Sequence, residues 1–123
     1  MFKVNDDLSI YCTRGDAVGF NVAAENNGIE HIFQSGDVVR LKVFEKKACN
    51  KVILQKDFNA VGNTTKVEIE LTSEDTKIGD PISKPVDFWY EVELNPLTSP
   101  QTIIGYDEDG PKVFRLFPEG GEG

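Results

Sequence analysis

The strongest structural signal in the chain is the run 86–94, which reads VDFWYEVEL. Apolar or aromatic side chains occupy every second position, and the positions between them hold acidic residues and Trp89. A period of two is typical of a β-strand with one buried face. Trp89 falls on the acidic face, where a large aromatic side chain is either covered by a loop or exposed as an anchor for a partner.

The same alternation recurs on both sides of this run. It is clear in three segments and weaker in four more, namely 17–23, 38–45 and 66–71, then 8–13, 51–58, 101–107 and 112–117. All six prolines fall between or at the ends of these segments, where no backbone donor is needed for strand pairing. Seven or eight short strands predict an all-β fold, and we expect an immunoglobulin-like antiparallel β-sandwich.

One stretch carries a helix-start signal instead. The segment 72–77 reads TSEDTK, so Thr72 can cap a helical turn and Asp75 stands three residues later. We therefore expect one short helical turn between two strands. The predicted organisation is a single β-sandwich domain over 1–117 and a flexible C-terminal tail over 118–123, which reads PEGGEG and has nothing to bury.

The charge balance excludes several classes of partner. Among 123 residues, 13 are Lys or Arg and 21 are Asp or Glu, which gives a formal net charge of −8. Nucleic acids and anionic membrane surfaces both attract clustered basic residues, so neither is an expected partner. No apolar run approaches the roughly 18 residues of a membrane span. The start, MFKVNDDLSI, lacks the apolar stretch of a signal peptide.

The residues that usually carry catalysis or bind metals are sparse. His31 is the single histidine, and it lies in a segment that reads as a solvated connection between strands. Cys12 and Cys49 have no CxxC neighbour, so zinc lacks a ligand set, and we expect two reduced thiols that behave as small apolar residues. We therefore expect no catalytic residue, no cofactor, no metal and no enzymatic activity.

Two short motifs have simpler structural interpretations. Arg14-Gly15-Asp16 matches an adhesion tripeptide, but it lies between two expected strands and is interpreted as a hairpin turn. The run 106–110, YDEDG, places three carboxylates beside a glycine, yet it lacks the further ligands of a calcium loop. A hairpin tip is the preferred interpretation of 106–110.

Candidate contact residues come from large apolar side chains at unusual positions. Trp89 is one of them, because of its place on a polar strand face. Ile29, Ile32 and Phe33 are the others, because they lie in a connection rather than in a strand. We predict that these four residues contact a partner.

The order of the segments resembles the N-terminal immunoglobulin-like domain of phage baseplate upper proteins and small prophage tail proteins of Gram-positive bacteria. The resemblance covers about residues 8–120 and is carried by these runs: RGD at 14–16, SGDVVRLKV at 35–43, TKVEIEL at 65–71 with TSEDTK at 72–77, FWYEVEL at 88–94, QTIIG at 101–105 and FRLFPEG at 114–120.

The resemblance implies a non-enzymatic tail or baseplate assembly or adaptor protein. Its partners would be other phage tail or baseplate proteins, and the family allows for a homo-oligomer. Such a protein is made in the bacterial cytoplasm and ends up in the tail of the virion. A second class stays open, a carbohydrate- or cell-surface-binding sandwich in which Trp89, Tyr90 or Tyr106 stacks on a sugar ring.

Overall fold

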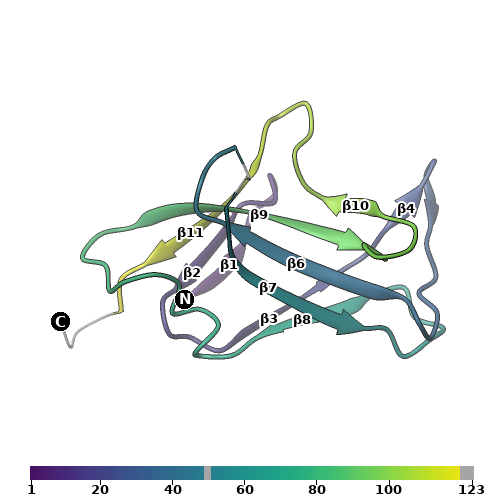
Figure 1. Ribbon diagram of the computed structural model, residues 1–123, viewed down its shortest axis with the longest axis horizontal. Helices are drawn as coiled ribbons and strands as arrows, with labels where there is room; N and C mark the ends of the chain where they lie inside the picture. The colour runs from purple at the N-terminus through teal and green to yellow at the C-terminus, as the bar shows by residue number, and fades with distance from the viewer. Residues whose placement is uncertain (49–50, 120–123) are drawn as a thin grey trace.

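The computed structural model describes residues 1–48 and 51–119 (Figure 1). Its strands are β1 (Phe2–Val4), β2 (Ile10–Thr13), β3 (Val18–Val22), β4 (Glu25–Asn26), β5 (Ile29–Glu30), β6 (Val38–Phe44), β7 (Val52–Asn59), β8 (Val67–Leu71), β9 (Val86–Leu94), β10 (Gln101–Ile104) and β11 (Lys112–Phe117). No helix occurs among these described residues, which confirms the predicted all-β class.

Each segment predicted from alternation contains a strand, and the run 86–94 coincides with β9. Three strands were not predicted: β1, β4 and β5. They span three, two and two residues, so they are too short for a period of two to be recognised.

The larger layer is a sheet in the order β1-β2-β11-β9-β6-β7, and β10 pairs with β9 on the side that β11 also occupies. The expectation of a purely antiparallel sandwich is wrong here, because β2 and β11 are parallel. Alternation of side chains reports which face is buried but carries no information on strand direction. A parallel pair needs a long crossover connection, and the intervening chain supplies it.

The smaller layer is the antiparallel pair of β3 and β8. The apolar faces of the two layers meet in the core, and alternate residues of β6, β8, β9 and β11 are buried. The apolar side chains with no exposed surface are Ile10, Cys12, Phe33, Val39, Leu41, Val43, Ile69, Val92, Phe114 and Leu116. The short hairpin of β4 and β5 stands apart from both layers, and its turn residues Asn27 and Gly28 have φ of 52° and 80°.

The two layers are joined at both sides of the sandwich. On the β1 side, the ring of Phe2 stacks on Phe20 of β3 with 5.8 Å between centroids. On the β7 side, Lys56 Nζ lies 2.6 Å from Asp75 Oδ2, just beyond β8. The core is therefore covered by an aromatic contact at one edge and by an ion pair at the other.

The segment 72–77 forms a hydrogen-bonded turn rather than a helix. The Asp75 N–H donates to Thr72 Oγ1 at 3.1 Å, and the Thr72 N–H donates to Asp75 Oδ2 at 2.9 Å. One bond of helical spacing follows, from the Thr76 N–H to the Thr72 carbonyl. Burial raises the pKa of Asp75, but hydrogen bonds from Lys56 and Thr72 outweigh it, and the net pKa is lowered. The predicted cap is thus present, and it holds a single turn.

The tripeptide 14–16 makes hydrogen bonds within the protein. Arg14 donates to the Gly79 carbonyl at 2.9 Å and to Glu119 Oε1 at 3.0 Å. The expectation of a hairpin turn is wrong, because β2 and β3 belong to different layers and 14–17 carries the chain from one layer to the other. Gly15, with φ of 89°, makes this change of direction possible.

The end of the domain and the cysteines are only partly described. β11 ends at Phe117, and Glu119 is held by Arg14, while 120–123 of the predicted tail lie outside the described residues. Cys12 is a buried free thiol, and burial raises its pKa to about 11. Cys49 lies outside the described residues. None of the described residues forms a helix that spans a membrane.

We expect Ile69→Ala to lower the free energy of unfolding by about 2–5 kcal/mol, because it removes a fully buried side chain and leaves a cavity. The control is Asn21→Ala on the exposed face of the same two-stranded sheet, with an expected change within about 0.5 kcal/mol. Urea unfolding measures both. Equal losses from the two variants would contradict the assignment of the buried face.

Candidate functional site

Four strongly exposed aliphatic side chains lie at one end of the sandwich, one on a short strand and three on connections. They are Ile29, Ile32, Val61 and Leu97, with 73%, 52%, 89% and 83% of their surface exposed. They belong to β5, the β5–β6 connection, the β7–β8 connection and the β9–β10 connection. Figure 1 shows these connections together at the end where β6 begins and where β7 and β9 finish. We call this surface the apolar end.

Asp37 connects the loops of the apolar end. Its Oδ2 accepts from the Gln34 N–H at 2.9 Å and lies 3.1 Å from His31 Nε2. Its Oδ1 accepts from Asn95 Nδ2 at 3.0 Å. Asn95 in turn accepts from the Val38 N–H at 2.8 Å through its own side-chain oxygen. One carboxylate thus joins the β5–β6 connection to the start of the β9–β10 connection.

Backbone hydrogen bonds attach the third loop. The Phe33 N–H donates to the Thr64 carbonyl at 2.7 Å, and the Ala60 N–H donates to the Asp37 carbonyl at 3.0 Å. Asn95 has φ of 48°, a left-handed conformation that asparagine tolerates better than most residues. The exposed aliphatic side chains are therefore presented by loops that are hydrogen-bonded to one another, which limits the entropy lost when a partner binds.

The Asp37 carboxylate is charged at neutral pH. The Gln34 backbone N–H lowers the pKa of Asp37 most, followed by the Asn95 amide, and burial opposes them. Because the pKa lies below the ordinary 3.8, the hydrogen bonds of Asp37 stabilise the fold above that pH. This stabilisation is lost as the pH falls through the lowered pKa.

Two of the sequence predictions in this region need correction. Phe33 is fully buried, because its backbone bridge to Thr64 draws it beneath the loops and into the core, so it is not available to a partner. His31 is not a solvated loop residue. Its ring packs edge-on against Phe33 with 5.0 Å between centroids, and its Nε2 faces Asp37.

Trp89 lies apart from the apolar end. It is partly exposed on the outer face of the larger sheet, where its register partners are Phe44 and Val113. The neighbouring Phe88 and Tyr90 point to the opposite, buried face. The structure thus brings Ile29 and Ile32 to one surface and places Trp89 on another, where its role in partner contact stays a prediction.

Val61 and Leu97 were missed in the sequence. Each is a single aliphatic residue inside a turn-rich segment, VGNTT at 61–65 and NPLTS at 95–99. A single apolar residue in such a segment forms no repeating pattern from which its burial or exposure could be predicted. The signal that was present is a large aliphatic side chain where Gly, Asn, Pro and Thr otherwise prevail.

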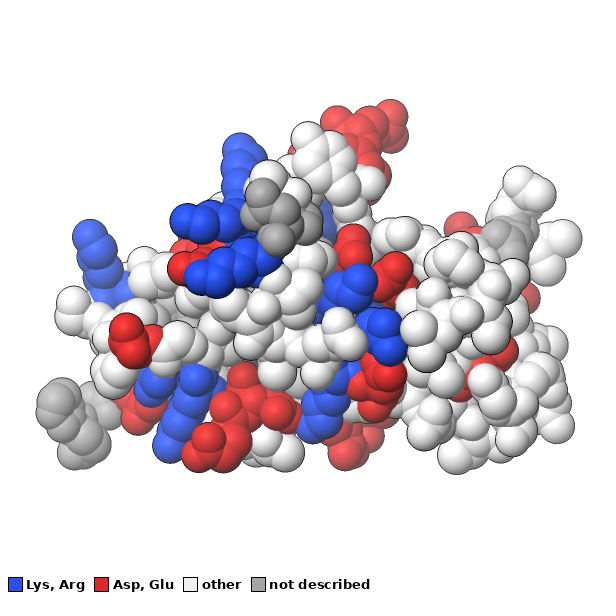
Figure 2. Space-filling view, viewed as in Figure 1, with Lys and Arg blue, Asp and Glu red and all other residues white. Residues whose placement is uncertain are grey.

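The apolar end also differs from the rest of the molecule in charge. Figure 2 shows Lys and Arg over the middle and the opposite end of the visible face, interspersed with Asp and Glu. At the apolar end the visible surface carries no Lys or Arg and only small areas of acidic side chains. An area with few charged side chains is typical of protein contact surfaces.

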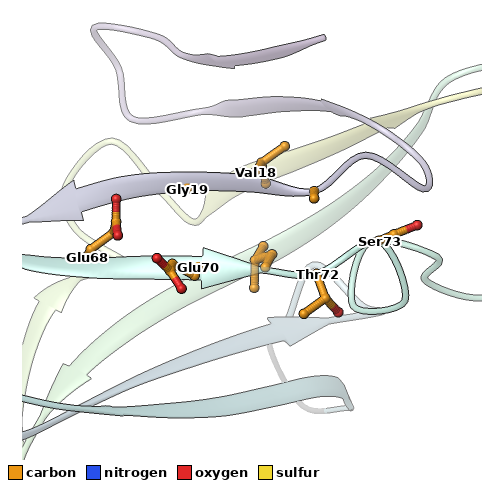
Figure 3. Close-up of a pocket in the computed structure, with 8 residues that line it drawn as sticks. Val18, Gly19, Glu68, Glu70, Thr72 and Ser73 are labelled. Atoms are coloured by element: carbon orange, nitrogen blue, oxygen red, sulfur yellow. The ribbon is translucent and has the colours of Figure 1, made fainter.

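A second feature is a shallow hollow of about 460 Å³ on the outer face of β3 and β8 (Figure 3). Gly19 lines it on β3, and Glu68 and Glu70 line it on β8. A hydrogen bond to the Glu70 carboxyl and the repulsion of its charge raise the pKa of Glu68. Two exposed carboxylates without a third ligand do not make a metal site.

The remaining motifs have structural roles. Asp107 and Gly110 form an isolated bridge, and Lys112 Nζ donates to Asp107 Oδ1 at 2.7 Å, so a tight turn is present at 107–110. The predicted hairpin is confirmed only in this turn, because β10 and β11 each pair with β9 rather than with each other. No group of three or more His, Cys, Asp or Glu side chains is arranged for a metal ion among the described residues.

The aromatic residues proposed for sugar binding do not form one platform. Tyr90 is 1% exposed, and its hydroxyl donates to the Leu8 carbonyl inside the protein. Trp89 points to the other face of β9, and Tyr106 is 71% exposed on the β10–β11 connection. Tyr90 is therefore excluded as a stacking residue, and Trp89 and Tyr106 belong to separate elements.

Comparisons of the chain with protein-family models, with curated proteins and with solved structures found no significant match.

We expect Asp37→Ala to lower the free energy of unfolding by about 1.5–3 kcal/mol, because it removes hydrogen bonds to a charged group that joins two loops. Amide hydrogen exchange at Gln34 and Asn95 should accelerate more than exchange in β9. The control is Asp6→Ala, an exposed aspartate, with an expected change within about 0.5 kcal/mol. Unchanged exchange at Gln34 and Asn95 would show that Asp37 does not hold the loops.

We expect Glu68→Gln to raise the stability of the protein at pH 7, because it removes repulsion from Glu70. A folded-state pKa above the ordinary 4.5 means that the wild-type protein gains stability from this site as the pH falls. The advantage of the variant should therefore shrink as the pH falls toward 4.5 and below. Thermal unfolding across this pH range measures it, with Glu74→Gln as the control. A variant advantage that is independent of pH would contradict the carboxylate pair.

Proposed function

We propose that the protein is a non-enzymatic structural module of a phage or prophage tail or baseplate and that it acts through protein–protein contacts at the apolar end. The observation that carries the proposal is the set of four exposed aliphatic side chains on hydrogen-bonded loops. Exposed apolar groups that gather at one place commonly mark contact surfaces. Loops that are already ordered suit such a surface.

The strand order supports an immunoglobulin-like module. In that fold, strands G, F and C are neighbours, C′ follows C in variable-type domains, and B pairs with E in the second layer. The order β11-β9-β6-β7 and the pair β3–β8 reproduce this arrangement. No cysteine stands on β3 or β9 to form the inter-sheet disulfide of antibody domains.

The position of the apolar end within this arrangement adds further support. In variable-type domains the B–C and F–G loops lie at the end of the sandwich that binds ligands. The corresponding connections in this chain run from β3 to β6 and from β9 toward β11, and they carry Ile29, Ile32 and Leu97. This correspondence supports the proposal, because variable-type domains bind their ligands from the same end.

A non-catalytic role agrees with how the polar residues of this end are used. Asp37, His31 and Asn95 bond to one another or to the backbone, and each of these contacts holds a loop. Their side chains therefore serve the shape of the surface. The exposed groups that a partner meets first are aliphatic, and aliphatic groups supply contact area rather than chemistry.

The test begins with the DNA that flanks the gene. We expect neighbours that encode tail tape-measure, tail-fibre or lysis proteins, and we expect one of the tail proteins to co-purify with this chain. Ile29→Asp combined with Leu97→Asp should weaken that binding by at least about tenfold, because it places charges in the contact. Tyr106→Ser is the matched control, since Tyr106 is as exposed as Ile29 but lies on another connection.

Two outcomes would contradict the proposal. Neighbouring genes for sugar transport or surface anchoring would contradict the tail assignment, and binding to a glycan panel that is lost in Tyr106→Ala or Trp89→Ala would favour the carbohydrate-binding alternative. Full binding of a tail protein by the doubly substituted variant would show that the contact lies on a different surface.

A further inference from the structure

We infer that the apolar end binds a different protein whose own apolar patch is bordered by Lys or Arg. This inference rests on the proposed function and adds the chemistry of the partner to it. It depends on the acidic residues beside the exposed aliphatic side chains, and above all on a pair of glutamates in the β4–β5 hairpin.

Glu25 and Glu30 stand directly opposite each other in that hairpin. Both are exposed, and neither forms an ion pair with another described residue. Like charges at directly opposed positions of neighbouring strands destabilise the pair of strands. The hairpin therefore carries an unfavourable pair of charges that nothing in the described protein compensates.

In the larger sheet, charged residues at directly opposed positions form ion pairs instead. Arg40 on β6 donates to its register partner Asp57 at 2.7 Å, and Arg115 on β11 donates to its register partner Asp87 at 2.6 Å. Opposed charges in the larger sheet are thus neutralised across strands. The glutamate pair is the contrast to this rule, and it lies where the exposed aliphatic side chains gather.

The loops around the apolar end carry a net negative charge. The stretches 24–37, 60–66 and 95–100 contain three acidic residues, Glu25, Glu30 and Asp37, and one basic residue, Lys66, which leaves a formal net charge of −2. Ile29 immediately precedes Glu30, and the hairpin is only two strands wide. Neighbouring residues of a strand point to opposite faces, so Ile29 and the two glutamates lie on the two faces of this narrow hairpin. A partner that covers Ile29 and closes around the edge of the hairpin reaches both glutamates, and basic side chains on that partner would offset their repulsion.

The same charges disfavour two other possible partners of this surface, a second copy of the chain and an anionic lipid membrane. A symmetric contact between two copies would bring the glutamate pairs of both copies together, and each chain already carries a net charge of −8. An anionic lipid surface would repel the glutamates as well. An apolar patch bordered by Lys or Arg on another protein would cover the aliphatic side chains and form ion pairs with the glutamates.

The experiment uses a random peptide library displayed on a carrier and selected on the immobilised full chain. Sequences that also bind the Ile29→Asp/Leu97→Asp variant are removed. We expect the enriched peptides to combine aliphatic or aromatic residues with Lys or Arg. Binding should weaken about two- to fivefold in Glu25→Gln/Glu30→Gln, which removes the exposed charges, and it should also weaken between about 0.05 M and about 0.5 M salt.

A matched control separates the effect of these two glutamates from the effect of net charge. Glu108→Gln/Asp109→Asn removes the same number of exposed carboxylates from the β10–β11 connection and should leave binding unchanged. Circular dichroism and thermal unfolding of each variant show whether it is folded. An equal loss of peptide binding in Glu25→Gln/Glu30→Gln and in Glu108→Gln/Asp109→Asn would reflect net charge alone and would overturn the inference.

Other outcomes overturn it as well. These are a selection that yields no peptide dependent on the apolar end, enriched peptides without basic residues, a dimer in sedimentation equilibrium that Ile29→Asp/Leu97→Asp abolishes, and co-sedimentation with phosphatidylcholine–phosphatidylglycerol vesicles that the same variant abolishes. The proposed function is tested separately, by the genes that flank this one. The peptide selection does not depend on those genes, so the inference and the proposed function can fail independently.

Discussion

The structure depends on the burial of one face of β9 between the two layers. β9 pairs with β6 along one side and with β11 and β10 along the other, so it holds the larger sheet together. Its inward residues Phe88, Tyr90, Val92 and Leu94 face the pair β3–β8 across the core. Because this one strand fixes both the pairing and the core, the loops that leave its ends are positioned by a rigid element.

The loops at one end illustrate how a partly buried polar network supports an exposed apolar surface. Asp37 orders three segments that are far apart in the sequence, either through its own carboxylate or through the backbone next to it. Without such contacts, aliphatic residues on flexible loops would fold back onto the core or lose entropy on binding. The polar network and the exposed aliphatic residues are therefore two parts of the same surface, one holding the shape and the other offering contact area.

Prediction from the sequence worked where side chains alternate over five or more residues. The segments around β3, β6, β8 and β9 were recognised because apolar and polar side chains alternate in each of them. It failed where the environment of a residue depends on distant segments. Phe33 belongs to a connection in the sequence, yet its bridge to Thr64 places it in the core. Ile32, one residue earlier, stays exposed, and no local pattern distinguishes the two residues.

The sequence by itself determined the all-β class, most of the strands, their buried faces and the acidic character of the surface, since these properties follow from local periodicity and composition. Only the tertiary structure decided that β2 and β11 run parallel and that four aliphatic residues, from β5 and three connections, share one end. It also decided that two glutamates oppose each other there. The physical reason is that direction, register and proximity arise from pairing between distant segments, and alternation along a strand does not encode which segments pair.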